Sequence, residues 1–566
     1  MRMSGSQAIG SRRRRLALAV GATAVAAAML VVPVSAGAAT RASAAPALPA
    51  WPASPHWEQY VEAPATLNLA PVSVVSVGGT VANPGGIVAG GHGDTTLTRS
   101  ATDTGPTDIV LDYGRDIGGI PSFTVAAAAG SPTMEAGYSE AQQYIAADGD
   151  GGAPALGADG DPSRADSYTV SGPGVITNRY IQGAERYQEI SLTSPGSVTL
   201  SAVGIRYTAY DGTPGTFKGY FLSSDATLNK EWYDGAYTLN LTQDTAGTQS
   251  GQWATEDGAM NLTARTGFIS SPTNDGVLKW GGNWQNYTSR RLYASKLDSA
   301  AALTDFETPG TPSVDVILDG AKRDRATFTG DLSVAAQTLY DTSTTDRGAV
   351  AQDANSAVIL YGIAPASRQA GIVAAMTKAL STPAGDLSVS SPVPASSTQI
   401  ISPFIGSSDV DARFLAGDTA GALQLLTDEW GPMTAGPDGG SMWEKLAADG
   451  TIDGGSTSLA HAWSTGPTSA LTSYVLGVTL TSPGYATWRI APQPGDLAWV
   501  EGAVPTPHGD ITVKWASSQT GFRIAIQTPD RTTGTVVLPP GLTRYSLAVN
   551  GRPIPLSPGQ IAISVR

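Results

Sequence analysis

The chain has 566 residues, no cysteine and a formal charge of −14 at pH 7. The absence of cysteine excludes disulfides, thiol nucleophiles and thiolate metal sites, and the acidic charge disfavours binding to nucleic acid or to anionic membranes. The length predicts two or three domains, and the 66 glycines and 38 prolines predict many turns and a large share of β-structure.

Residues 1–44 predict a secretory signal peptide. The basic segment Arg12–Arg15 precedes the apolar run Leu16–Val32, and small residues at 36–38 or 42–44 provide a cleavage site. The leader holds six arginines and no acid, so its removal takes the formal charge to −20. We expect secretion by the Sec or the twin-arginine route. No later segment has about 18 uninterrupted apolar residues, so we expect no membrane attachment after cleavage.

Residues 45–220 predict an N-terminal β-sandwich. Short β-like runs recur between glycine, proline, serine and aspartate, for example Ile109–Tyr113, Ser122–Val125 and Val198–Val203. The run Asp148–Asp161 has the acidic and glycine-rich composition of a calcium loop. It lacks the ligand spacing and the closing glutamate of an EF-hand, which favours a flexible surface loop.

Residues 221–482 predict a helical domain, and residues 483–566 predict a C-terminal β-sandwich. Ser224 or Asp225 can cap a first helix, in which apolar residues recur near every 3.6 positions. The later domain shows the alternation of apolar residues that is typical of strands. The fold class is therefore a multidomain protein of α and β domains. Helices are expected near residues 226–241, 288–304, 332–341, 353–361, 366–380, 408–416, 418–430 and 458–477.

The most densely charged stretch is Asp319–Asp331, with three carboxylates and three cations. A carboxylate held among cations can transfer protons or bind polyol hydroxyls, although the same pattern is typical of a solvated loop before a helix. Glu444 follows Trp443, and such a pair is more often a surface acid beside a packed aromatic residue. A lone histidine such as His461 is more often structural than functional.

The residues at 319–331, Asp-Gly-Ala-Lys-Arg-Asp-Arg-Ala-Thr-Phe-Thr-Gly-Asp, resemble the acidic signature of the α-L-rhamnosidases, glycoside hydrolase family 78. The resemblance implies an (α/α) six-hairpin helical barrel between two β-sandwiches. In relatives a long helical stretch stands where this chain has only residues 341–352, so we expect an incomplete barrel. A remnant of an inserted β module is expected near 245–310. Further phrases that resemble the family lie at 112–119, 138–140, 183–187, 221–232, 440–445, 458–467 and 491–497.

The resemblance also implies which residues form the site. Asp324 occupies the position of the general acid, where many relatives have the longer glutamate. Glu444 occupies the position of the base that activates water in an inverting reaction. Phe328 stands where an aromatic residue, usually tryptophan, contacts the sugar. The substrate-binding positions are matched by Asp319, Arg323, Phe328, Asp331, Trp443, His461 and Trp463.

The function implied is a secreted α-L-rhamnosidase that removes terminal non-reducing rhamnose from plant glycosides or polysaccharides, with no cofactor. No metal is expected, because His56, His92 and His508 are scattered along the chain. A second hypothesis is a catalytically impaired relative that binds rhamnosyl glycans without hydrolysis. A lyase is a third, since lyases abstract a proton beside a uronate with a tyrosine, histidine or metal-assisted base. The aglycone, the linkage and the oligomeric state cannot be read from the sequence.

Overall fold

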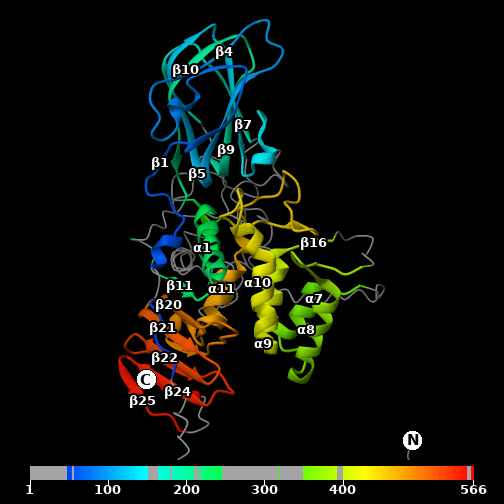
Figure 1. Cartoon of the computed structure of the whole chain (residues 1–566), viewed down its shortest axis with the longest axis vertical. Helices are drawn as coiled ribbons and strands as arrows, with labels where there is room; N and C mark the ends of the chain where they lie inside the picture. The colour runs from blue at the N-terminus through cyan, green and yellow to red at the C-terminus, as the bar shows by residue number, and fades with distance from the viewer. Residues whose placement is uncertain are drawn as a thin grey trace, which may run out of the picture. The chain divides into compact units, whose positions relative to one another are not determined.

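The computed structural model describes part of the chain (Figure 1). All described residues belong to one unit, Ala47–Arg566. The predicted signal peptide, the insert near 245–310, the helices near 288–304 and 332–341 and the charged stretch Asp319–Asp331 lie outside these residues. The described ranges are 48–53, 56–150, 164–178, 181–209, 215, 217, 219–244, 316–317, 349–391, 399–557 and 562–566.

The N-terminal part is a sheet of ten strands, in which the 23-residue strand β5 is the central element. The first half of β5 pairs with β2 and β9, whereas the second half pairs with β10 and β8. The three β runs predicted from the sequence lie in β5 and β10. The strands are β1 (Asn68–Leu69), β2 (Ser73–Gly78), β3 (Thr80–Ala82), β4 (Thr95–Arg99), β5 (Thr107–Ala129), β6 (Thr133–Ser139), β7 (Ala165–Thr169), β8 (Gly174–Thr177), β9 (Gln182–Leu192) and β10 (Gly196–Tyr207).

A bulge interrupts β5 between its two halves. The register with β9 shifts between Asp112 and Ile117, and Gly114 has a φ of 81° in this interval. A positive φ of this size is accessible to glycine without a steric penalty. The bulge carries Asp116, whose side chain is buried. Ile109 and Phe123, one from each half of β5, lie in the same buried cluster, so both halves of the strand contribute to one core.

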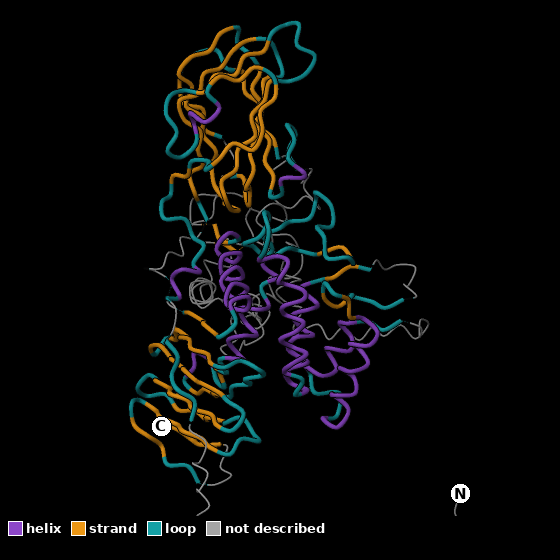
Figure 2. Tube along the Cα trace, viewed as in Figure 1, coloured by secondary structure: helices purple, strands orange, loops and turns teal. Residues whose placement is uncertain are grey.

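The helices come from the middle of the chain, and strands dominate both ends (Figure 2). Asp225 caps α1 as predicted, because its carboxylate accepts hydrogen bonds from the N–H groups of Thr227 and Leu228. Five of the predicted helices are present in the described residues at or near the expected positions. The α-helices are α1 (Ala226–Leu241), α7 (Gln352–Leu360), α8 (Ala366–Leu380), α9 (Pro403–Ala416), α10 (Thr419–Thr434) and α11 (Gly466–Ala470).

The single helix predicted over 458–477 is wrong. The chain is not helical until the 3-10 turn Ala462–Ser464, after which α11 and a π-helical turn, Leu471–Val475, follow. Pro467 lies in the first turn of α11, a position that proline favours because it lacks an N–H to donate. The residues before His461 donate their N–H groups elsewhere, as described below.

The C-terminal strands form two sheets. β11 enters the larger sheet beside β20 although it precedes the helices in sequence. The larger sheet contains β11 (Tyr220–Ser223), β20 (Trp499–Thr506), β21 (Gly509–Ser517), β22 (Gly521–Gln527), β24 (Arg544–Val549) and β25 (Arg552–Ile554), and the smaller contains β18 (Val478–Leu480), β19 (Thr487–Ile490), β23 (Thr533–Val537) and β26 (Ala562–Val565). Short two-stranded pairs are β12 (Gln243–Asp244) with β13 (Val316–Ile317), β14 (Ser381–Thr382) with β15 (Gly385–Asp386), and β16 (Ile400–Ile401) with β17 (Leu446–Ala447).

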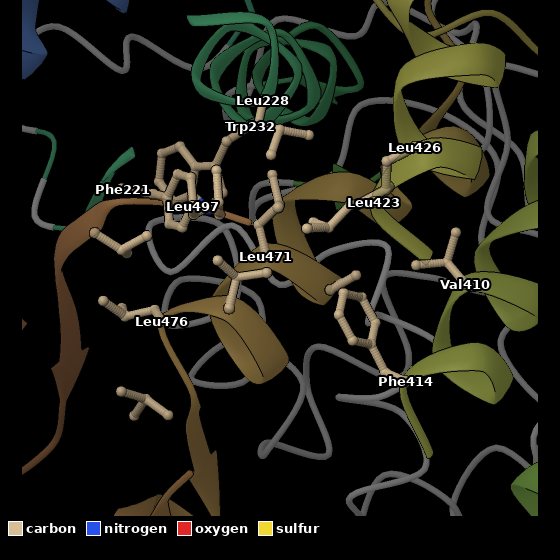
Figure 3. Packing of buried hydrophobic residues seen from close by; sticks show 14 of the residues in the cluster. Phe221, Leu228, Trp232, Val410, Phe414, Leu423, Leu426, Leu471, Leu476 and Leu497 are labelled. Atoms are coloured by element: carbon tan, nitrogen blue, oxygen red, sulfur yellow. The ribbon is translucent and has the colours of Figure 1, made fainter. Parts of the chain in front are cut away.

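One large hydrophobic cluster joins the helices to the C-terminal sheets. Phe221 of β11 and Trp232 of α1 lie beside Leu471 (Figure 3), and the indole N–H of Trp232 donates to the Thr472 hydroxyl at 3.0 Å. The indole N–H of Trp515 in β21 donates to the Val475 carbonyl at 3.0 Å. These contacts show that the C-terminal strands pack against the helical part. Burying a large apolar side chain in such a cluster contributes roughly 1.5–3 kcal/mol. Among the described helices, none combines the length and the apolar character that crossing a membrane requires.

Candidate active site

The segment Ser441–Glu444 follows α10 and is fixed by its backbone. The N–H of Met442 donates to the Thr238 hydroxyl of α1 at 2.8 Å, and the N–H of Trp443 donates to the Met433 sulfur at 3.3 Å. The side chain of Trp443 belongs to the large hydrophobic cluster. Glu444 is 7% exposed, so the predicted base is a buried acid rather than a surface one.

A second segment, Ser458–His461, runs beside the first. Glu444 donates its N–H to the Ser458 carbonyl at 2.8 Å, and His461 donates its N–H to the Met442 carbonyl at 2.8 Å. The N–H of Ser458 donates in return to Oε2 of Glu444 at 3.2 Å. The backbone of one segment therefore fixes the carboxylate of the other.

His461, Trp463 and Glu444 form one group of contacts. The rings of His461 and Trp463 lie 4.2 Å apart at an angle of 35°, and the Trp463 indole N–H donates to the Glu444 carbonyl at 3.1 Å. The ring of Phe404, at the start of α9, lies 5.4 Å from that of Trp463. A carboxylate and an imidazole can transfer protons, and a partly exposed indole offers apolar surface to a ligand.

Two carboxylates from the N-terminal sheet contact these segments. Glu140, directly after β6, accepts hydrogen bonds from the N–H groups of Leu459 at 2.9 Å and Ala460 at 3.2 Å. Asp116, in the bulge of β5, accepts from the Ser441 hydroxyl at 2.6 Å. Burial, and then the nearby charge of Glu140, raises the pKa of Asp116 to about 8.

No group of three or more histidine, cysteine or acidic side chains that could hold a metal ion occurs in the part of the chain that the structure describes. The contacts around Glu444 instead use backbone amides and aromatic rings. The described part of the site therefore holds two buried acid–base groups, Glu444 and His461, beside the partly exposed indole of Trp463.

Parts of the chain are similar in sequence to known proteins. Residues 477–551 match the model of the bacterial α-L-rhamnosidase C-terminal domain. An α-L-rhamnosidase from Alteromonas sp. (strain LOR) is 34% identical over 83 residues, which are 14% of this chain and 9% of that protein. This part of the chain is similar to the α-L-rhamnosidases.

Solved rhamnosidase structures share the fold. The family 78 rhamnosidase of Bacillus sp. GL1 matches with a TM-score of 0.50 and 18% identity, covering 80% of this chain and 55% of that one. The α-L-rhamnosidase of Dictyoglumus thermophilum also has a TM-score of 0.50, with 14% identity over 88% of this chain and 62% of that one. The rhamnosidase fold thus extends over most of the chain, which spans little more than half the length of these relatives.

The structure brings together some of the predicted rhamnosidase site residues. Glu444, His461 and Trp463 lie in contact, and Trp443 is directed into the hydrophobic cluster. The predicted acid Asp324 lies outside the described residues, as do Asp319, Arg323, Phe328 and Asp331.

Sequence reasoning assigned no role to Asp116 and Glu140. The phrases that contain them, 112–119 and 138–140, were noted only for their resemblance to the family. Nothing local indicates that these carboxylates contact residues more than three hundred positions away, at Ser441 and Leu459.

Proposed function

We propose that this protein is a glycoside hydrolase that removes terminal α-L-rhamnose from glycosides or polysaccharides. The observation that carries the proposal is the carboxylate of Glu444, buried and fixed by the Ser458 amide beside His461 and Trp463. The shared fold and the matched C-terminal domain support rhamnose as the sugar.

In the proposed mechanism Glu444 is the general base. It takes a proton from a water that attacks the anomeric carbon on the face opposite the leaving group, so the configuration inverts. Asp324 is the proposed general acid, which protonates the glycosidic oxygen as the bond breaks. An inverting pair requires carboxyl groups roughly 6.5–9.5 Å apart, which leaves room for the water.

The remaining groups bind the sugar. The Trp463 ring offers a flat apolar surface to the methyl face of the deoxy sugar, and the His461 imidazole donates or accepts a hydrogen bond with a sugar hydroxyl. Asp319, Arg323, Phe328 and Asp331 supply further contacts in the same proposal. The helices form part of a six-hairpin barrel, and residues 1–44 direct secretion through the Sec or twin-arginine route.

A second candidate is a relative that binds rhamnosyl glycans without cleaving them. The short segment at residues 341–352, where the resemblance implies a long helical stretch, favours this candidate. A chain that lacks part of the catalytic barrel can retain a sugar-binding surface while losing turnover.

One experiment separates the two candidates. The full chain is incubated with an aryl α-L-rhamnoside, and release of the aryl group is measured beside calorimetric binding of L-rhamnose. Release that Glu444→Gln abolishes supports the hydrolase, whereas binding without release supports the second candidate. An aryl β-D-glucoside serves as the control substrate. Neither release nor binding would contradict both.

A further inference from the structure

Four consecutive backbone N–H groups hold the segment Ser458–His461 in place. The first donates to the Glu444 carboxylate, the next two donate to Glu140, and the fourth donates to the Met442 carbonyl. Every amide of the segment is thus directed at a specific acceptor. Glu140, a single residue at the end of a strand of the N-terminal sheet, accepts two of these four hydrogen bonds.

Glu140 is itself buried and is connected to further hydrogen-bonded residues. It is 1% exposed, and its own N–H donates to the Asp150 carboxylate at 3.3 Å. Asp150 forms a buried ion pair with Arg164 at 3.2 Å, and Arg164 donates further to the Gly183 carbonyl at 2.8 Å. A charged acceptor supported in this way forms hydrogen bonds about twice as strong as neutral ones.

Asp116 holds the segment Ser441–Glu444, as Glu140 holds Ser458–His461. Its carboxylate accepts from the Ser441 hydroxyl, three residues before Glu444. The hydroxyl of Tyr237 donates to the Asp116 carbonyl at 2.5 Å, which connects the bulge of β5 to α1. The next residue of α1, Thr238, accepts the N–H of Met442. Residues 441 and 442 are therefore held from the sheet and from the helix.

We propose that Glu140 and Asp116 are positioning residues, which set Glu444 and His461 from the N-terminal sheet without touching substrate. This role rests on the proposed function, because it concerns the same site. In this proposal the N-terminal sheet holds the segments Ser441–Glu444 and Ser458–His461 in register. If Glu140 is removed, the amides of Leu459 and Ala460 lose their acceptor, and a buried N–H without an acceptor drives the segment to rearrange. The Ser458 amide then leaves Glu444, and the carboxylate loses its orientation.

The variants are chosen to change the hydrogen-bonding groups with little change of shape. In Glu140→Gln the amide oxygen accepts only one of the two N–H groups, and its NH₂ group faces the other. In Asp116→Asn the oxygen can still accept from Ser441, so the smaller effect is expected there. Glu135→Gln is the matched control, since Glu135 lies on β6 of the same sheet and accepts from the Thr193 hydroxyl at 3.4 Å, with no contact to either segment in the described structure.

Steady-state kinetics on an aryl α-L-rhamnoside provide the functional measurement. We expect Glu140→Gln to lower kcat by about 10- to 100-fold, because a displacement of about 1 Å costs up to that factor, with KM within about three-fold of wild type. The control keeps the wild-type kcat. Ser441→Ala and Asp116→Ala are expected to be non-additive, since they remove the two ends of one hydrogen bond.

Hydrogen exchange of the backbone amides provides a measurement that does not depend on activity. The amides of Leu459 and Ala460 are expected to exchange at least ten-fold faster in Glu140→Gln than in wild type and in the control. Unchanged exchange, or faster exchange with a wild-type kcat, overturns the positioning role while leaving the proposed function intact. If Glu140→Gln does not fold, the kcat of Asp116→Asn and the coupling between Ser441→Ala and Asp116→Ala decide in the same way. A wild-type chain that releases no rhamnose overturns the proposed function first, and this role with it.

Discussion

Glu444 and Ser458 exchange two hydrogen bonds, one between their backbones and one from the Ser458 amide to the Glu444 carboxylate. The carboxylate is therefore oriented by the chain segment that also carries His461. A residue oriented by backbone rather than by a second flexible side chain loses little entropy when it acts. This relationship leads to the first prediction.

Glu444→Gln is expected to lower kcat by at least about 100-fold, because loss of a general base costs roughly 10²–10⁴ in rate. The loss should be similar for good and poor leaving groups, since both need an activated water. Glu501→Gln is the control, because Glu501 pairs with Lys514 on β20 and β21 at 2.8 Å. Substantial hydrolysis by Glu444→Gln would end its assignment as the base.

Asp324→Asn is expected to affect substrates unequally. A poor leaving group needs protonation as the bond breaks, so turnover of a rhamnosyl disaccharide should fall far more than turnover of an activated aryl rhamnoside. Wild-type activity is expected to fall above mildly acidic pH, because the acid must keep its proton in order to donate it, and this fall should vanish in the variant. Equal losses on both substrates, or a disaccharide cleaved at nearly the wild-type rate, would remove Asp324 as the acid.

The stability of the protein is expected to fall as the pH rises from about 4 to about 8. The raised pKa of Asp116, about 8 against a usual 3.8, means that the folded protein holds a proton there that the unfolded chain has released. The stabilisation from this proton is fully present below the pKa that Asp116 has in the unfolded chain, and it is lost as the pH rises toward the raised pKa of the folded protein. The loss is at most about 1.4 kcal/mol per pH unit for one proton.

Urea denaturation across this pH range measures the slope. Asp116→Asn cannot ionise, so its free energy of unfolding should change less with pH than that of wild type. The exposed Asp510→Asn should keep the wild-type slope. Identical slopes for wild type and Asp116→Asn would show that Asp116 is not protonated in the folded protein.

Arg413 of α9 is expected to be critical for stability. It is buried and pairs with Asp386 at 2.6 Å and with Asp409 at 3.0 Å, and removing it leaves both carboxylates buried without their cation. Arg413→Ala should cost about 3–5 kcal/mol. Lys445→Ala removes the half-exposed pair with Asp453 and should cost at most about 1 kcal/mol. Equal costs in chemical denaturation would contradict this account.

Local patterns in the sequence were sufficient for much of the fold. The cap at Asp225 and the helical spacing that follows predicted α1, and the alternation in the last domain predicted β21 and β22. The entry of β11 into the C-terminal sheet was not predictable, because its partner β20 is distant in sequence and pairing depends on tertiary contacts.

In the candidate site too, local sequence patterns indicated some features, whereas others depend on contacts between distant residues. Glu444 and His461 were assigned to the candidate site because each lies in a recognisable phrase, and the structure places them on two paired segments. The extended backbone before His461 could not, since its amides donate to acceptors from distant parts of the chain instead of forming a helix. The apolar spacing over 458–477 resembled a helix, but long-range hydrogen bonds to Glu140 and Glu444 determined the conformation.

The most direct test of the central claim is proton NMR of the full chain mixed with an aryl α-L-rhamnoside. The account predicts that the anomeric signal of β-L-rhamnose appears first and that the α signal follows by mutarotation, because water attacks from the face opposite the leaving group. Initial release of α-L-rhamnose would contradict the proposed roles of Glu444 and Asp324. No release of rhamnose at all would contradict hydrolysis itself.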